Sequence, residues 1–320
     1  MTNAVKVLEA RDVLQLMPRI DALEVMRTLF RALGDRRAVQ PPQTLALFPG
    51  GGGDFITYLG VLEAQQVFGA KLSPYITRPG GALVTAWTTL MSMETGRPLM
   101  LCDAMQLTTE RTAATTALAV QLLARPAATR LAIIGSGAVA QAHLRQVRGL
   151  RDWGEIRVHS RTLMRAPDRQ DVLHALDPRL RICRSVAEAV RDADVVMLCT
   201  SSATPVLDPA DLVTSALITS ISTNAVHAHE VPPVSLHSMD VYCDDRTVTP
   251  MSAGEMVLAA ANEDWSALKL VADLGELLTG RAPVPDHDRH RFFRSIGLGL
   301  EDIAMAKAIF DLIEHDATVS

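Results

Sequence analysis

Two glycines in the middle of the chain have the spacing of a dinucleotide-binding loop. Gly135 and Gly137 follow the apolar run Leu131–Ile134 and precede a segment with the apolar spacing of a helix. In such a loop the first glycine permits a tight turn, the second lets the backbone approach a pyrophosphate, and the helix N-terminus offers free N–H groups to the phosphates. A glycine turn in an ordinary α/β domain is the alternative. The flanking strand and helix favour a Rossmann-type site that includes Gly135, Gly137, Ala138 and Val139.

The residues at the end of the next predicted strand, 155–160, bear on the choice between NAD and NADP. An acidic residue there would accept hydrogen bonds from the ribose 2′-OH of NAD. This chain has Ser160, Arg161 and Thr162 instead, and no acid. The hydroxyl groups can donate to a 2′-phosphate and the guanidinium can pair with it. These residues predict NADP rather than NAD, whereas the alternative is that Arg161 is a solvated surface residue.

Hydroxyl side chains follow the most apolar predicted strand, 194–200. Ligands of open α/β sheets bind beyond the carboxyl ends of the strands, so we expect Thr200 and Ser201 to contact the cofactor and Thr204 to border the substrate. Asn224, which follows the next predicted strand, is a second candidate for that border. No histidine stands at a spacing that would activate a serine, so a serine hydrolase is disfavoured.

Two cations in the first part of the chain could hold an anion. Arg111 lies in the first turn of a predicted helix, 107–124, where a cation opposes the helix macrodipole and a substrate carboxylate or cofactor phosphate would compensate it. The alternative is an ion pair with Glu110 or Asp103. Lys71 lies in a strand-like segment, where a partly buried lysine with an adjustable pKa could polarise or protonate a carbonyl or imine. The alternative is an exposed strand lysine.

No group of residues predicts a metal site. The four cysteines are not within metal-ligand spacing of one another and form no disulfide framework. The histidine-containing segments 227–230 and 286–290 have the composition of polar loops.

Two kinds of predicted elements position these residues. Short apolar strands alternate with helices from about residue 128 to 245, which predicts βαβ units and a parallel sheet. The first 125 residues instead contain a helix at 21–33 and alternating strands between 44 and 93, which indicate an antiparallel sheet. The predicted fold is α/β: a Rossmann-type doubly wound parallel sheet at 119–294, inserted in a discontinuous α+β substrate-binding and dimerisation domain at 1–118 and 295–320.

Composition excludes several classes of protein. The chain has 320 residues, a net charge of −5 and 48% hydrophobic residues, which does not suit a nucleic-acid-binding protein. No apolar run is long enough to cross a membrane, and the charged N-terminal residues are not typical of a signal peptide, so we expect a cytoplasmic protein. Ten of the 13 aromatic residues lie within 1–115 or 290–320, and aromatic residues are enriched at subunit interfaces.

Six segments, in order along the chain, resemble signatures of the ornithine cyclodeaminase/mu-crystallin family. The resemblance implies a two-domain subunit that forms a homodimer, with Arg111 holding the substrate carboxylate and Lys71 contacting the carboxylate or the reacting nitrogen. The segments match G-x-K at 69–71, T-G-x-P followed by Asp at 95–103, L-T-x-x-R-T-A-A at 107–114, the nucleotide loop at 133–138, A-T-x-S-x-x-P at 199–205 and F-x-S-x-G-x-x-x-x-D at 293–302.

Three departures from the family pattern bear on the reaction. Gln43 stands where the family usually has a basic residue, and we expect it to bind substrate. Asn224 stands where the cyclodeaminases have an aspartate, and it cannot act as a base at neutral pH. Ser160 replaces the acidic NAD determinant of the cyclodeaminases. The last two changes disfavour ornithine cyclodeamination.

We therefore predict an oxidoreductase that transfers a hydride between NADP(H) and the α-carbon of a small, carboxylate-bearing amino or imino acid. Its catalytic residues would be Lys71, Arg111 and Asn224, and its substrate-binding residues Gln43, Lys71, Arg111 and Thr204. It would be a ketimine or cyclic imine reductase, or an amino-acid dehydrogenase. The first alternative is a cyclodeaminase-type ammonia lyase that recycles its NAD(P). The second is a non-catalytic, crystallin-like binder of nucleotide and small ligand.

Overall fold

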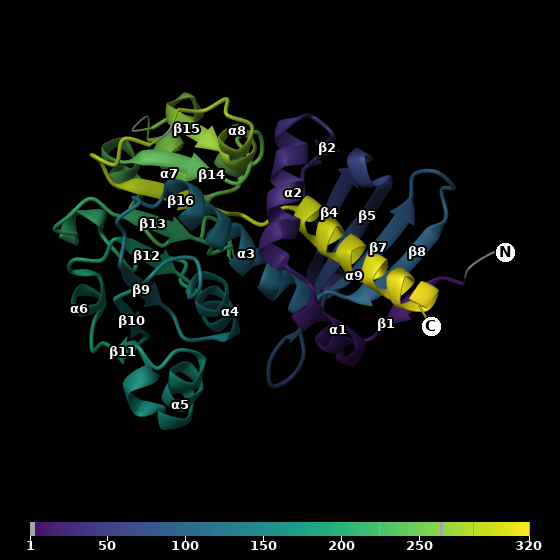
Figure 1. Cartoon of the computed structure of the whole chain (residues 1–320), viewed down its shortest axis with the longest axis horizontal. Helices are drawn as coiled ribbons and strands as arrows, with labels where there is room; N and C mark the ends of the chain where they lie inside the picture. The colour runs from purple at the N-terminus through teal and green to yellow at the C-terminus, as the bar shows by residue number, and fades with distance from the viewer. Residues whose placement is uncertain (1–3, 224, 263–264, 284, 320) are drawn as a thin grey trace. The chain divides into compact units, whose positions relative to one another are not determined.

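The computed structural model describes residues 4–223, 225–262, 265–283 and 285–319. The chain divides into two compact units (Figure 1): unit 1 comprises Met1–Arg111 and Leu298–Ser320, and unit 2 comprises Thr112–Gly297. The sequence placed the boundaries at 118/119 and 294/295. In the structure the units divide at 111/112 and 297/298, so helix α3 (Met105–Leu123) contributes residues to both units.

Unit 1 is built on a largely antiparallel sheet, which confirms the sheet type expected for the first part of the chain. Its strands follow the order β1-β8-β7-β5-β4-β2, with β3 on β4 and β6 on β5, and β1 runs parallel to β8. The strands are β1 (Lys6–Leu8), β2 (Ala38–Val39), β3 (Thr44–Leu47), β4 (Gly53–Leu62), β5 (Val67–Ile76), β6 (Leu83–Val84), β7 (Trp87–Ser92) and β8 (Pro98–Asp103).

One face of this sheet is covered by the C-terminal helix α9 (Gly299–Val319), which packs on β4, β5 and β7 (Figure 1). The approach is close enough to require glycine. A Cβ at Gly69 would lie 2.1 Å from the carbonyl oxygen of Thr89 and 2.8 Å from Ile303 of α9, and one at Gly299 would lie 2.3 Å from the carbonyl oxygen of Leu59. Glycines on both surfaces therefore let the start of α9 rest directly on the strands.

Two further helices complete unit 1. Helix α2 (Ala22–Gly34) packs on α9, and α1 (Ala10–Leu16) packs on β8. The side chain of Asp21 accepts a hydrogen bond from the N–H of Glu24 and so caps the start of α2. Met26, Leu29 and Phe30, spaced as on one helical face, are buried.

Unit 2 is built on a parallel sheet, as the alternation of strands and helices predicts. The strand order is β11-β10-β9-β12-β13-β16-β14-β15. The order reverses between β9 and β12, which is the switch point where ligands bind in doubly wound sheets. The strands are β9 (Arg130–Ile134), β10 (Glu155–His159), β11 (Leu180–Ile182), β12 (Val195–Leu198), β13 (Leu217–Ser220), β14 (Asp240–Cys243), β15 (Leu270–Asp273) and β16 (Arg291–Arg294).

Helices connect most of these strands, and two of them pack on the same central strand. Both α4 (Ala138–Val147) and α6 (Val186–Val190) contact β9. Within the described residues, no helix is long and apolar enough to cross a membrane. The remaining helices of unit 2 are α5 (Pro167–Leu176), α7 (Gly254–Ala261) and α8 (Leu274–Leu278).

Candidate active site

The glycine loop of unit 2 joins the end of β9 to the start of α4. Gly135 has a φ of +132°, and a Cβ there would lie 2.4 Å from the carbonyl oxygen of Cys199, so the position requires glycine. Gly137 is different, because its backbone would accept any residue and a Cβ there would meet nothing within 4 Å. The space that a side chain at Gly137 would fill is therefore open to a ligand at the N-terminus of α4, where N–H groups favour phosphate.

A cavity of about 630 Å³ opens beside this loop, at the carboxyl ends of β9, β10, β12 and β13. It brings together every residue that the sequence assigned to the cofactor. Thr204, assigned to the substrate, lies in the same wall. The predicted residues that line the cavity are Gly135, Gly137, Ala138, Val139, Ser160, Arg161, Thr162, Thr200, Ser201 and Thr204.

The side of the cavity beyond β10 is formed by hydroxyl groups and a cation. The hydroxyl groups of Ser160 and Ser136 lie 2.9 Å apart, and the side chain of Arg161 is exposed. Among the described residues that line the cavity there is no aspartate or glutamate. The donors fit a nucleotide with a 2′-phosphate, and the open position of Gly137 fits its pyrophosphate.

Glu230, which the sequence places in a polar loop, is fully buried at the same edge of the sheet. Its carboxylate accepts hydrogen bonds from the N–H and hydroxyl groups of Thr200, at 2.9 and 2.7 Å, and from the hydroxyl of Ser220 at 2.8 Å. It also accepts from the N–H groups of Ile221 and Ser222. One carboxylate thus holds the segments that follow β12 and β13. Sequence reasoning missed it because most of its partners are backbone groups of distant residues.

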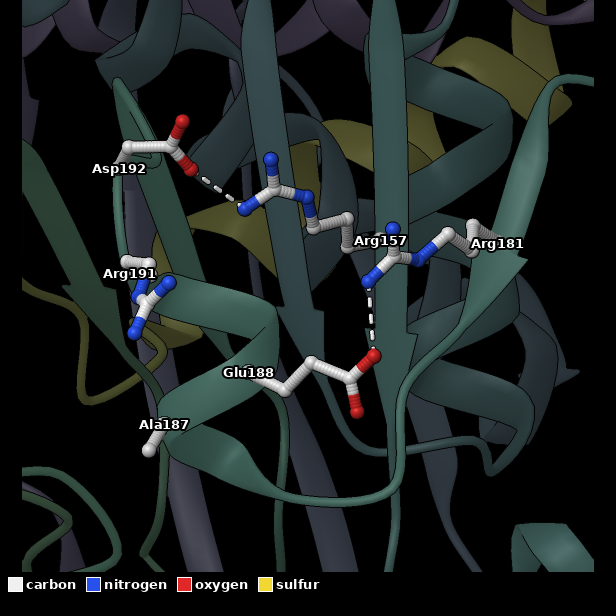
Figure 2. Close-up of a pocket in the computed structure, with 6 residues that line it drawn as sticks. All are labelled: Arg157, Arg181, Ala187, Glu188, Arg191 and Asp192. Carbon is white, nitrogen blue, oxygen red and sulfur yellow. Dashed lines mark hydrogen bonds and ion pairs between the residues drawn. The ribbon is translucent and has the colours of Figure 1, made fainter.

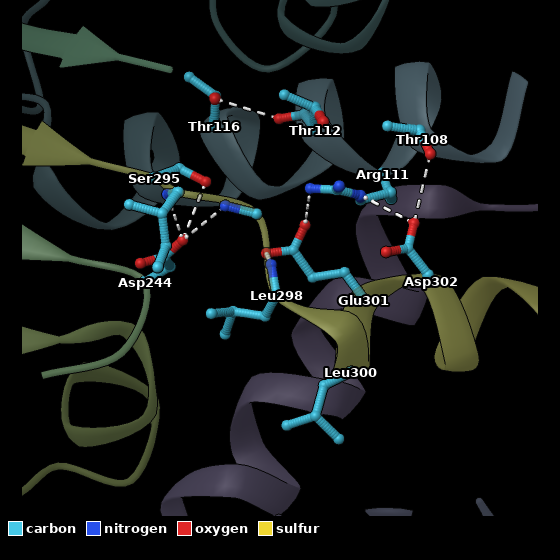
Figure 3. Close-up of polar contacts among 12 residues, drawn as sticks. Thr108, Arg111, Thr112, Thr116, Asp244, Ser295, Leu298, Leu300, Glu301 and Asp302 are labelled. Atoms are coloured by element: carbon cyan, nitrogen blue, oxygen red, sulfur yellow. Dashed lines mark hydrogen bonds and ion pairs between the residues drawn. The ribbon is translucent and has the colours of Figure 1, made fainter. Parts of the chain in front are cut away.

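In unit 1, Lys71 and Arg111 converge on two carboxylates from the first turn of α9. Figure 3 shows Arg111 beside both of these carboxylates, Glu301 and Asp302. The Nζ atom of Lys71 lies 2.8 Å from Oδ2 of Asp302, and Nε of Arg111 lies 3.2 Å from Oδ1 of the same residue. Nη1 of Arg111 donates to Oε2 of Glu301 at 2.9 Å. All four side chains are buried, and the charges balance when Lys71 is protonated.

Lys71 is only 3% exposed, which excludes the alternative of an exposed strand lysine. Its Nζ lies 4.1 Å from the ring centroid of Tyr58 and 3.4 Å from the hydroxyl of Thr108. Burial lowers the pKa of Lys71 to about 8, against the opposing effect of the Asp302 carboxylate. An amine with this pKa can both hold and release a proton near neutral pH.

Arg111 keeps its charge. Burial by itself would lower the pKa of the guanidinium, but Asp302 and Glu301 raise it above its usual value. The predicted alternative, a pair with Glu110 or Asp103, is wrong. Glu110 accepts a hydrogen bond from Gln106, and Asp103 accepts one from the N–H of Met105.

The other predicted substrate residues have different outcomes. Gln43 immediately precedes β3, whose first residue, Thr44, pairs with Thr57 of β4. Asn224 lies outside the described residues. Within the part of the chain that the structure describes, no group of three or more His, Cys, Asp or Glu residues could hold a metal ion.

A second hollow in unit 2, of about 510 Å³, is lined by three arginines and two acidic residues (Figure 2). Arg157 donates to Asp192 at 2.6 Å, and Arg181 donates to Glu188 at 2.7 Å. Because these two cations have carboxylate partners, they offer little net attraction to an anion.

The parallel sheet, the glycine loop and the cavity at its switch point define a Rossmann-type dinucleotide-binding protein with a second, α+β unit. The family follows from comparison with known proteins. The chain belongs to the ornithine cyclodeaminase/mu-crystallin family, whose model matches residues 2–317.

Two relatives and one solved structure are similar to the chain. The chain is 58% identical, over 93% of its length and 94% of the relative's, to the NAD(P)H-dependent anabolic L-arginine dehydrogenase of Pseudomonas aeruginosa. It is 26% identical, over 91% of both chains, to the ketimine reductase mu-crystallin of Macropus fuliginosus. The structure of Thermococcus litoralis Delta(1)-pyrroline-2-carboxylate reductase with NADH and L-proline shares the fold, with a TM-score of 0.89, 22% identity and 98% of both chains covered.

The role of Glu230 can be tested by the substitution Glu230→Gln. The change places an NH2 group or a weaker acceptor opposite N–H and hydroxyl donors that have lost access to water. We expect the free energy of unfolding to fall by about 2 to 4 kcal/mol, measured by urea denaturation.

A matched control is Asp171→Asn, which neutralises an exposed carboxylate on α5. This change should alter the free energy of unfolding by no more than about 0.5 kcal/mol. Equal stability of the two variants would show that the hydrogen bonds to Glu230 do not hold the edge of the sheet.

Proposed function

We propose that the protein is an NAD(P)H-dependent L-arginine dehydrogenase. The observation that carries this proposal is the 58% identity, over 93% of the chain, with the P. aeruginosa enzyme of that activity. In the anabolic direction, the 2-oxo acid of arginine, ammonium, NADPH and a proton would give L-arginine, NADP⁺ and water. When bound, the nicotinamide supplies the hydride that becomes attached to the α-carbon.

The buried cluster of unit 1 supports a role in holding the reacting end of the substrate. Nε and Nη1 of Arg111 have carboxylate partners, and no hydrogen bond or ion pair between described residues involves its Nη2. We assign Nη2 and the ammonium of Lys71 to the substrate carboxylate. An imino acid carries a carboxylate and an iminium whose charges cancel, so its reacting end suits a cluster that is itself neutral.

We assign the proton transfer to Lys71. Condensation of ammonia with the 2-oxo acid releases water, and the departing hydroxyl group needs a proton donor. The pKa of Lys71 is about 8, so its Nζ atom carries a proton below that pH and loses it above that pH. Its Nζ atom is held between Tyr58, Thr108 and Asp302.

The face of the unit-1 sheet that lies opposite α9 supports the proposal of a homodimer. On the face opposite α9, large apolar side chains remain exposed or half-buried, which is typical of a surface that pairs with another subunit. Leu72 is 46% exposed, and its cross-strand neighbour is Trp87. We propose that two chains associate through this face, which also contains Leu59, Phe68, Met91 and Leu101.

The activity is tested with purified protein, L-arginine and NADP⁺, following NADPH absorbance. We expect net reduction of NADP⁺ and release of ammonium, with the reverse reaction when the 2-oxo acid, ammonium and NADPH are supplied. Formation of proline and ammonium from L-ornithine without net change in NADPH would instead identify a cyclodeaminase. Absence of turnover with both amino acids would contradict the dehydrogenase.

The cofactor preference is tested at Arg161. We assign its guanidinium to the 2′-phosphate of NADP, together with Ser160 and Thr162. Arg161→Ala should weaken NADPH binding about tenfold and leave the Kd of NADH within about twofold, measured by fluorescence titration. Arg165→Ala, an exposed arginine nearby that does not line the cavity, is the control and should change neither Kd. An equal loss for both nucleotides in Arg161→Ala would refute this assignment.

The proton-transfer role of Lys71 predicts a pH dependence. Because the ammonium is the active form, kcat/KM for the 2-oxo acid should fall as the pH rises through about 8. Lys71→Arg keeps a positive charge throughout this range, so its profile should lack that fall. The concentration of free ammonia changes with pH in the same way for both proteins. The ratio of their pH profiles of kcat/KM therefore shows the contribution of Lys71 alone. A fall near pH 8 in both proteins would assign it to another group.

A further inference from the structure

Resting on the proposed function, we propose that Asp54 forms the subsite for the guanidinium group of the substrate. Asp54 lies on β4, on the face of the unit-1 sheet that carries Lys71. The subsite would hold the far end of an arginine-like substrate while the cluster around Lys71 holds its carboxylate.

The strand register places Asp54 and Lys71 on one face. Lys71 of β5 pairs with Tyr58 of β4, and directly opposite side chains in an antiparallel pair share a face. Side chains alternate along a strand, so Tyr58, Ile56 and Asp54 follow one another on that face. The corresponding residues of β5 after Lys71 are Ser73 and Tyr75, and Tyr75 pairs with Asp54.

Helix α9 covers this face only as far as the pair formed by Lys71 of β5 and Tyr58 of β4. Its first turn lies over Gly60, where a Cβ would come within 3.0 Å of Leu300. Beyond Lys71 the same face becomes accessible, since Tyr75 is 47% exposed and Leu47, which pairs with Asp54 from β3, is 74% exposed. An open strip of sheet therefore leads from the buried cluster to Asp54.

The length of this strip fits arginine. Lys71 and Tyr75 are four residues apart, which is about 13 Å along a strand. An extended arginine spans about 7 Å between its carboxylate carbon and its guanidinium carbon, as standard bond lengths require. A hydrogen-bonded contact of about 3 Å at each end brings the total to about 13 Å. Alanine and other short amino acids would leave Asp54 out of reach.

The chemistry of the subsite also favours a guanidinium. Among the described residues, no hydrogen bond or ion pair involves the carboxylate of Asp54, although the residue is partly buried. A carboxylate can accept two parallel N–H bonds from a guanidinium. The neighbouring ring of Tyr75 and the side chain of Leu47 offer surfaces for the flat cation and its methylene groups.

The test compares L-arginine with L-citrulline, whose neutral ureido group has nearly the shape of the guanidinium. The measurement is kcat/KM for NADP⁺ reduction with each amino acid, in the wild-type protein and in Asp54→Asn. We expect the wild-type preference for L-arginine over L-citrulline to fall roughly tenfold to a hundredfold in Asp54→Asn. Asp54→Glu retains a carboxylate and should recover part of the preference.

The control is Asp35→Asn, which removes an exposed carboxylate at the end of α2. This variant should keep the wild-type preference, and urea denaturation of all variants checks that they are folded. A wild-type enzyme that oxidises L-arginine, together with an unchanged preference in Asp54→Asn, would overturn the subsite alone. A wild-type protein that oxidises neither amino acid would overturn the proposed function and the subsite with it.

Discussion

The architecture of unit 1 depends on charge compensation between two buried cations and the first turn of α9. Removing an ammonium or guanidinium from water costs several kcal/mol unless a carboxylate compensates it. Asp302 contacts both Lys71 and Arg111, and Glu301 contacts Arg111. The position of the two acids at a helix N-terminus is itself favourable, because they complement the helix macrodipole.

This compensation requires α9 to approach the sheet closely, and the glycines meet that requirement. Gly60, Gly69 and Gly299 leave no room for a Cβ between helix and strands. A larger residue at any of these positions would move Asp302 away from Lys71 and leave a buried cation poorly compensated. The close packing of α9 on the sheet and the compensation of the two buried cations therefore depend on each other. This explains why the chain returns to unit 1 after residue 297.

The features that could be predicted from the sequence are those with a local cause. The loop at Gly135 was identifiable because its function requires glycine at defined spacing between a strand and a helix. The sequence around Lys71 does not decide between a buried and an exposed lysine. It also does not identify the partners of Arg111, since Glu301 and Asp302 lie about 190 residues away. Strand β16 was missed for a related reason. Its sequence, Arg-Phe-Phe-Arg, is too polar to suggest a central strand.

The C-terminal end of β16, at Arg294, is compensated by the same kind of distant partner. Arg294 is fully buried and forms an ion pair of 2.9 Å with Glu255. It also donates to the carbonyl oxygens of Ser222 and Ala228, near the segment that Glu230 holds. A charged side chain in a buried strand becomes tolerable only when the fold supplies such acceptors, so its strand character cannot be inferred from the local sequence.

The neutral residue at position 43 also fits a substrate with a cation at its far end. Gln43 directly precedes β3, in which Leu45 and Leu47 pair with Ile56 and Asp54 on the face that carries Tyr58 and Lys71. A long basic side chain in place of Gln43 could extend along this face, where it would repel a guanidinium and compete for the Asp54 carboxylate. Glutamine can still donate a hydrogen bond without adding charge. On this argument, the loss of the family's usual cation at position 43 and the carboxylate at position 54 act together, since each lowers the electrostatic cost of placing a second positive charge on this face.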